Sequence, residues 1–242
     1  MKLLISNQHG AIVMALLPFL YGMLSSPTVI WQHAFLLLAW ACLYLFTYPF
    51  FNLFKGRNLA QNRTWAIGYG LTALLFSVPA LWHNWQLLYF LLAMLPFALL
   101  TVYYVKQKNE RALGNDLAAI VIFGIAGMAA YYFADRTFDP QLARVFLYPS
   151  LFFVGTTLYV KSILRERKDP RYLQASIIFH VLCVLLIAYF DWQTALCFVP
   201  ALLRAVIVPL WVMPRKRLNP KQVGLIEMGI SFLFLFGLLL VG

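Results

Sequence analysis

The chain has 242 residues, of which 63% are hydrophobic and only 11% are charged. A soluble domain carries about 25% charged residues, so this composition excludes a soluble enzyme, a disulfide scaffold and a disordered tail. Long apolar runs separated by short basic clusters are typical of a multi-pass membrane protein. The net charge of +11 would suggest nucleic-acid binding in a soluble protein. Here it follows from the loops, and no nucleic-acid partner is expected.

Apolar stretches long enough to cross a bilayer as helices recur along the whole chain, because a helical span needs about 20 residues. The predicted spans are residues 10–29, 31–54, 64–82, 86–105, 117–134, 143–161, 172–190, 194–213 and 222–241. They predict an all-α membrane protein, a bundle of about nine transmembrane helices. The bundle is expected to form a single integral membrane domain over residues 1–242.

Basic residues mark alternate loops. Sixteen of the 19 Lys and Arg residues fall at the N-terminus or in the loops after the second, fourth, sixth and eighth spans. Arg136 and Arg144 fall on the opposite side, and Arg204 lies inside the eighth span. By the positive-inside rule this distribution predicts a cytoplasmic N-terminus and a C-terminus outside.

Ionisable residues inside spans are the best pointers to function, because each costs about 2.5–3.5 kcal/mol at the membrane centre. Arg204 lies in the middle of the eighth span, between Pro200 and Pro209. We expect it either to bond the carbonyls that these prolines free or to contact an anionic or polar ligand. Glu227 lies one to two turns into the next span, after a short hairpin, and is the expected counter-ion of Arg204.

The remaining polar residues of the spans give weaker signals. His180, near the middle of the seventh span, is interpreted as a hydrogen-bonded packing residue. Cys42, Cys183 and Cys197 all lie within spans without a C-x-x-C pair, so they are interpreted as small hydrophobic residues. The sequence has no H-x-x-x-H or H-E-x-x-H spacing, and neither a metal site nor a cofactor is predicted.

Several short segments carry a family resemblance. Gln8-His9-Gly10-Ala11 leads into an apolar run with Leu17-Pro18-Phe19, and Asn109-Glu110-Arg111 and the segment from Arg165 to Arg171 follow later. In these segments, in length and in span pattern, the sequence resembles the YwiC-like family of bacterial membrane proteins. The resemblance implies a multi-pass protein of the bacterial cytoplasmic membrane and does not imply a particular activity.

The topology is also distantly similar to that of UbiA-type prenyltransferases. Those proteins bind a prenyl diphosphate through magnesium and two aspartate-rich motifs, in the loops after spans 2 and 6. Here the loop after span 2 keeps an asparagine, Asn52, but has no aspartate, and the loop after span 6 offers only Glu166 and Asp169. Because a magnesium–diphosphate site needs several carboxylates, the resemblance implies metal-dependent chemistry that has been lost or replaced.

The function predicted from the sequence is binding of an anionic amphiphile in a polar cavity open to the cytoplasm. Basic side chains would hold phosphate or carboxylate oxygens directly, with an isoprenoid or acyl tail between the helices and membrane lipids as partners. The residues predicted to border the cavity are His9, Lys55, Arg57, Arg111, Arg167, Arg204 and Glu227. Three alternatives stay open: a UbiA-like lipid or prenyl transferase, a transporter and a membrane assembly factor. No residue is assigned a catalytic role, so enzymatic activity is left undecided.

Overall fold

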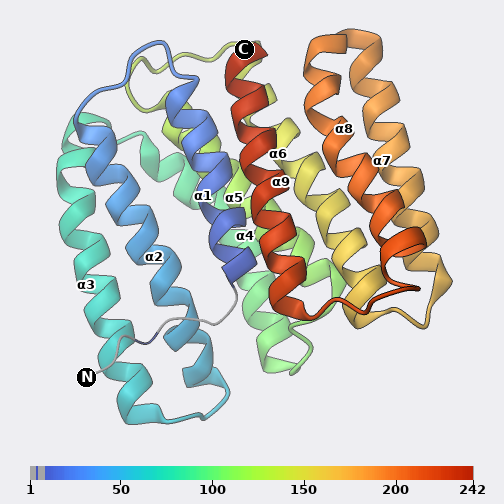
Figure 1. The fold of residues 1–242 in the computed structure, drawn as a ribbon. Coiled ribbons are helices and arrows are strands. Elements are labelled where there is room, and N and C mark those ends of the chain that lie inside the picture. The colour runs from blue at the N-terminus through green and yellow to red at the C-terminus, as the bar shows by residue number, and fades with distance from the viewer. Residues whose placement is uncertain (1–3, 5–8, 242) are drawn as a thin grey trace. The chain divides into compact units, whose positions relative to one another are not determined.

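The computed structural model describes residue 4 and residues 9–241, apart from the side chain of His9. All regular elements in this described part are helical, which confirms the predicted all-α bundle (Figure 1). Along the described residues, nine α-helices and two π-helical segments follow one another as α1 (His9–Leu24), α2 (Gln32–Phe54), α3 (Leu59–His83), α4 (Leu87–Lys106), α5 (Leu113–Tyr132), α6 (Pro140–Val160), η1 (Lys161–Arg165), α7 (Pro170–Phe190), α8 (Trp192–Ile207), η2 (Val208–Val212) and α9 (Pro220–Val241).

Eight helices in the described residues are long and apolar enough to cross a membrane, and α1 is a shorter apolar helix of 16 residues. The protein is therefore a multi-pass membrane protein. The predicted first span, 10–29, extends too far, because α1 ends at Leu24. Pro27 supplies no backbone donor and disfavours helical geometry at the residue before it, which explains why the helix stops in this segment.

Two α-helices continue into π-helix. Segment η1 extends α6, and η2 extends α8. Lys161, the last residue of the predicted sixth span and one of the 16 basic residues counted toward the loops, is buried in η1 with 2% exposure. In η2, Pro209 lacks the N–H that would continue an α-helical ladder, which accounts for a local change of hydrogen bonding there. Such π segments occur frequently at functional sites.

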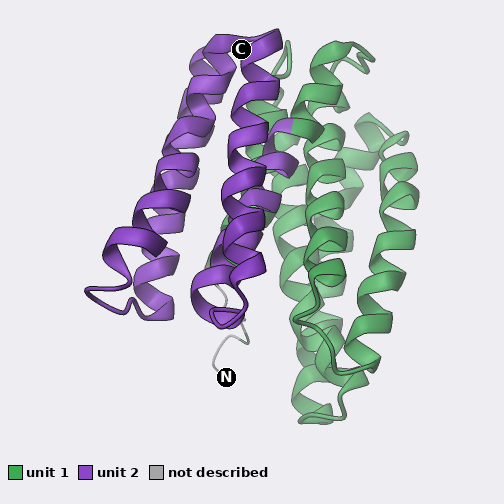
Figure 2. Ribbon diagram, turned by 90° about the vertical axis from the view of Figure 1, so that its right-hand side faces the viewer, with its two compact units in different colours: residues 1–147 green, residues 148–242 purple. Residues whose placement is uncertain are grey.

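The helices group into two compact units, residues 1–147 and 148–242, with the boundary inside α6 (Figure 2). In the first unit α2 packs against α3, and α5 packs against both α1 and α4. In the second unit α8 packs against both α7 and α9. The single membrane domain expected over residues 1–242 stays a prediction.

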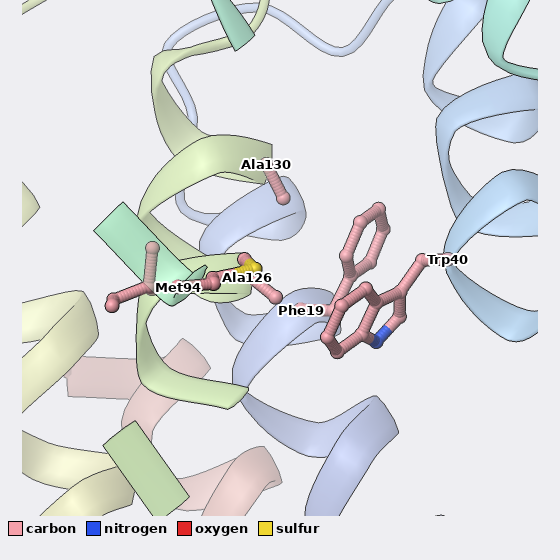
Figure 3. Close-up of a cluster of buried hydrophobic side chains, with 6 residues drawn as sticks. Phe19, Trp40, Met94, Ala126 and Ala130 are labelled. Carbon is pink, nitrogen blue, oxygen red and sulfur yellow. The ribbon is translucent and has the colours of Figure 1, made fainter. Parts of the chain in front are cut away.

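The core of the first unit is apolar. Phe19 of α1, Trp40 of α2, Met94 of α4, and Ala126 and Ala130 of α5 meet in one buried cluster (Figure 3). The indole N–H of Trp40 donates to the Ala15 carbonyl at 2.8 Å. The one polar atom of that ring is thus satisfied inside apolar surroundings.

Helices α1 and α5 approach each other through backbone atoms. A Cβ added at Gly22 would lie 2.0 Å from the carbonyl oxygen of Gly127, and one at Gly127 would lie 2.5 Å from that of Pro18. Neither position has room for a methyl group. Glycine is therefore required on both helices for this crossing, as is common where membrane helices pack closely.

Polar contacts hold the loops at one end of the first unit together. Thr28 donates its hydroxyl to the Asp135 carboxylate, Ser26 donates to the Tyr131 carbonyl at 3.2 Å, and the Asn84 amide donates to the Phe133 carbonyl at 3.0 Å. The loops after α2 and α4 meet elsewhere, through Lys55 and Glu110. Loops of this unit therefore alternate between two ends, as the span pattern predicts. Their orientation relative to the cytoplasm stays a prediction.

Candidate functional site

Arg204 lies in the interior of the second unit, on α8, with 5% exposure. The helix begins at Trp192, where the Asp191 carboxylate accepts hydrogen bonds from the backbone N–H groups of Gln193 and Thr194. Ala201 and Ala205 lie one turn from Arg204 or next to it and are also buried. Small neighbours on the same helix leave room for the long arginine side chain beside them.

Glu227 of α9 is the counter-ion of Arg204. Its Oε2 accepts a hydrogen bond from Nη1 of the guanidinium in an ion pair, and Glu227 is itself buried. The pairing predicted from the sequence is confirmed. It places one positive and one negative charge together in the interior of a helical unit, where neither side chain reaches water easily.

His180 of α7 contacts the same guanidinium. Its Nδ1 lies 2.7 Å from the Ser176 carbonyl oxygen, which can only accept, so Nδ1 carries the ring proton. The lone pair of Nε2 therefore faces Nη2 of Arg204 at 3.2 Å and accepts its N–H. This geometry fixes His180 as a neutral imidazole with one defined tautomer. His180, interpreted from the sequence as a hydrogen-bonded packing residue, is thus also a hydrogen-bond partner of Arg204.

Helix α6 completes the surroundings of Arg204. The Thr156 hydroxyl lies 3.5 Å from Nη1, and the guanidinium carbon lies 4.3 Å from the centre of the Tyr159 ring, a cation–π contact. Gly155 makes space for the histidine, since a Cβ there would lie 2.9 Å from Nε2 of His180. Four helices of the second unit, α6 to α9, therefore supply one polar network.

Polar atoms of this network remain unpaired within the described part of the chain. They are Nε of Arg204, Oε1 of Glu227 and the hydroxyls of Tyr159 and Ser176, all buried. Buried polar atoms are paired in the large majority of cases, so several orphans in one network call for an explanation. The formal charges of Arg204 and Glu227 cancel and His180 is neutral, so the summed charge of the network is zero.

The other predicted site residues are distributed over both units. In the first unit, Lys55 pairs with Glu110 at 2.7 Å, and Arg57 and Arg111 are exposed. In the second unit Arg167 is exposed. The side chain of His9, at the start of α1, lies outside the described residues. The structure thus joins Arg204 to Glu227, and a cavity shared by all seven residues stays a prediction.

A concave basic surface lies between η1 and α7. It is lined by residues 164–171, which include Arg165, Arg167, Lys168 and Arg171. The carboxylate of Asp169 caps α7 by accepting from the backbone N–H of Arg171 at 2.9 Å. That acid is therefore engaged locally, and positive charge dominates the surface. Over the described residues, no group of three or more His, Cys, Asp or Glu side chains gathers as a metal site would require.

Sequence reasoning identified the charged pair but missed its surroundings. Tyr159, Thr156 and Gly155 are common residue types in membrane helices, and no spacing on α6 distinguishes them. The available signal was depth: His180, like Arg204, lies in the middle of its span, where a polar group needs a partner. Two polar residues at a similar depth in consecutive helices are natural candidates for a contact.

Comparison with known proteins places the whole chain among full-length relatives. It is 57% identical over 242 residues to an uncharacterized protein of Haemophilus influenzae, covering 100% of this chain and 99% of the relative. It is 36% identical over 236 residues to the uncharacterized protein YwiC of Bacillus subtilis, covering 97% and 96%. No solved structure matches the chain.

A family model described as YwiC-like protein matches residues 5–131. That match lies within the first unit, whereas the alignments to both relatives span nearly the whole chain and so include most or all of the second unit. The family match includes residues 8–11 and 109–111, where the sequence resembles this family. The alignments to the two relatives extend the similarity to the residues after 131. The chain belongs to the YwiC-like family.

Proposed function

We propose that this protein resides in the bacterial cytoplasmic membrane and binds an anionic amphiphile through its basic loops, without a metal or other cofactor. The observation that carries the proposal is the concave surface of residues 164–171. It presents four basic side chains against two acidic ones, and one of those acids caps a helix. A surface of this charge attracts anionic headgroups, at about 1 kcal/mol per basic residue near a membrane.

Arginine side chains favour a phosphate or carboxylate as the bound group. Arg165, Arg167 and Arg171 carry planar guanidinium groups, whose paired N–H donors match two oxygens of such an anion. Arg57 and Arg111 of the first unit, with Lys55 and His9, would attract anionic headgroups by the same chemistry at their own loops. Lys55 is already partly neutralised by Glu110, so its share is the smaller one.

The buried pair has a different place in this proposal from the one predicted for it. Glu227 neutralises Arg204, so the pair attracts an external anion only weakly, and we separate it from the headgroup site. The apolar groove lined by Trp192, Leu196, Pro200 and Gly237 lies at the start of α8, next to the end of α7. The basic surface lies at the other end of α7, where that helix begins. The groove therefore does not continue the basic surface, and an isoprenoid or acyl tail would lie along other lipid-facing helix surfaces.

A UbiA-like transferase has less support from the structure. Its magnesium would need carboxylates in the loop after α6, where Asp169 serves as a helix cap and Glu166 is exposed among basic residues. No contact of the described residues favours an assembly factor. The feature that bears on transport is the buried network around Arg204 and Glu227.

The proposal is tested by charge removal with a matched control. The variant Arg167→Gln/Lys168→Gln/Arg171→Gln should bind phosphatidylglycerol with roughly a hundredfold lower affinity, as expected for three lost charges. Native mass spectra recorded over a range of lipid concentrations measure that affinity. The control Arg215→Gln/Lys216→Gln/Arg217→Gln removes the same charge from the loop between η2 and α9. Equal losses in both variants would show bulk surface attraction and overturn the site. Loss of binding on magnesium chelation would overturn the metal-free form of the proposal.

The same proposal requires the basic loops to face the cytoplasm. Reporter fusions after residues 110 and 168 should report the cytoplasmic side, and fusions after residues 84 and 138 the outer side. A reversed result at residue 168 would put the concave surface of residues 164–171 outside the cell and contradict the proposed location.

A further inference from the structure

We propose that Glu227 is a proton-binding site inside the membrane, and that Arg204 and His180 direct the proton to the unpaired oxygen of its carboxylate. The inference is independent of amphiphile binding at the basic loops. It rests on the arrangement of the network formed by α6, α7, α8 and α9. The ligand is a proton exchanged with water, and the network supplies one acceptor for it.

The acceptor is Oε1 of Glu227. Oε2 of the same carboxylate is engaged by Arg204, whereas Oε1 is buried and has no hydrogen-bond partner in the described part of the chain. A carboxylate oxygen removed from both water and donors is costly while it is charged. A proton on Oε1 removes that negative charge without disturbing the contact at Oε2 sterically.

The neighbouring titratable groups are poor alternatives. His180 donates from Nδ1 to Ser176, and its Nε2 accepts from Arg204 at 3.2 Å. A proton on Nε2 would set two N–H groups against each other and bring a second positive charge next to the guanidinium. His180 therefore stays neutral for as long as Arg204 remains in place.

Groups on α6 and its extension do not compete either. The Tyr159 ring lies against the guanidinium, and a neutral phenol is a weak proton acceptor. Lys161, buried in η1 two residues further on, has contacts of its own. Arg204 itself keeps its proton under all ordinary conditions. Glu227 is then the position at which an added proton is accommodated.

Proton uptake changes which helices are tied together. The proton from water forms an O–H bond at Oε1, and the summed charge of the network rises from zero to +1. The ion pair between α8 and α9 becomes a contact between a cation and a neutral acid, which is weaker. Arg204 keeps its contacts to His180 on α7 and to Thr156 and Tyr159 on α6. The proton therefore loosens α9 selectively, while α6, α7 and α8 stay joined.

Infrared spectroscopy can observe this carboxyl without altering it. The chain has three glutamates, Glu110, Glu166 and Glu227. In a Glu110→Gln/Glu166→Gln variant labelled with ¹³C-glutamate, every isotope-shifted carboxyl band belongs to Glu227. We expect pH-jump difference spectra of this variant in lipid to show a protonated carboxylic acid band that forms on acidification, reverses on return and shifts in deuterium oxide.

Further variants make the assignment specific. Glu227→Gln in the unlabelled protein should remove one reversible carboxylic acid band per chain, whereas Glu110→Gln should leave that band in place. The tryptophan near-ultraviolet circular dichroism, recorded in the same pH cycle, should show that the fold persists. A double variant that remains folded over the whole pH cycle without any isotope-shifted carboxylic acid band would overturn the proposal. So would a band that persists unchanged in a folded Glu227→Gln protein.

Discussion

Lys55–Glu110 in the first unit and Arg204–Glu227 in the second are both ion pairs between a basic side chain and a glutamate, in contrasting surroundings. The side chains of the former are 15% and 41% exposed, and those of the latter are 3% and 10% exposed. A pair that water reaches gains little, typically below about 1 kcal/mol. A pair removed from water depends on its own geometry and on added hydrogen bonds. Arg204 has such bonds, to His180 and Thr156.

The two units differ in the same way in their interiors. The first unit has an apolar centre around Phe19 and Trp40, with polar contacts such as Thr28–Asp135 between its loops. The second has its polar contacts in the middle of its helices. The interior of the first unit is thus mainly apolar packing, whereas the second unit adds a charged network to an apolar cluster around Tyr159, Ala205 and Val223.

The largest expected effect comes from removing half of the buried pair. Arg204→Met should destabilise the protein by about 3–5 kcal/mol, because Glu227 is left as an uncompensated buried charge. The double variant Arg204→Met/Glu227→Met should lose less than Arg204→Met alone. Denaturant unfolding in detergent micelles measures both values. The single variant Glu227→Met completes the comparison, and a double-variant loss equal to the sum of the two single losses would mean that the two residues do not interact.

Glycine replacements compare shape in the two units. Gly22→Ala drives a Cβ into the backbone of Gly127 and should cost at least about 1–3 kcal/mol, since neither helix can yield locally. At Gly155→Ala the nearest atoms belong to the His180 side chain rather than to backbone, so the loss should be smaller and should reflect the hydrogen bonds of the ring to Ser176 and Arg204. Gly224→Ala, with open space at the Cβ, is the matched control on α9 and should be neutral or stabilising.

A His180→Ala background provides a second control for the Gly155 substitution. In a His180→Ala background the contact that opposes a methyl group at position 155 is gone, so Gly155→Ala should then cost little. Thermal unfolding of the four proteins in this cycle checks the result. An unchanged cost in both backgrounds would show that Gly155 is needed for some reason other than space for His180.

The exposed pair should give a much smaller effect. Glu110→Gln removes the partner of Lys55 and should cost less than about 1 kcal/mol. The difference between wild type and variant should shrink further in about 1 M salt, where the screening length falls to about 3 Å. A loss as large as that of Arg204→Met would show that the two ion pairs stabilise the fold equally despite their different exposure.

Acid titration should give the smallest effect, at the loop before α6. Tyr131 donates its hydroxyl to Asp139 at 2.7 Å, and this hydrogen bond lowers the pKa of that carboxyl. A lowered pKa means that the ionised form stabilises the fold above about pH 4 and that the stabilisation is lost as the pH falls through the folded-state value. Tyr131→Phe should therefore melt at a lower temperature than wild type at neutral pH. This difference in melting temperature should narrow in acid.

Much of the fold follows from hydropathy, because lipid requires each span to satisfy its own backbone. The ends of elements are less determined. Helix α3 begins at Leu59, before the predicted residue 64, and α6 begins at Pro140 rather than 143. Polar residues such as Gln61 and Arg63 extend a helix into the interface without contributing to an apolar window. The π-helical segments have no sequence period of their own and were not predicted.

The candidate site was predictable in part for the same reason. Arg204 and Glu227 stand out because ionisable residues are rare in apolar spans. Their neighbours do not, because the contacts of Tyr159 and Gly155 depend on how four helices rotate about their axes. His33 shows the same limit: its place at the end of a span, next to Trp31, is typical of an interfacial residue, yet it is buried, with Nε2 3.2 Å from the Ala130 carbonyl. Trp82 and Trp85, by contrast, are exposed as expected for an interface.

The order of the helices along the chain has a consequence for synthesis. Only Asp191 separates α7 from α8, so the two helices form a tight hairpin whose residues, Arg204 and His180 included, are all translated before α9. Glu227 is translated 23 residues after Arg204. Until then, the acceptors that the described residues offer the guanidinium lie on helices already made, namely the His180 ring nitrogen and the Thr156 hydroxyl. A nascent chain that ends before α9 therefore carries an uncompensated cation, and arrival of the last helix neutralises it.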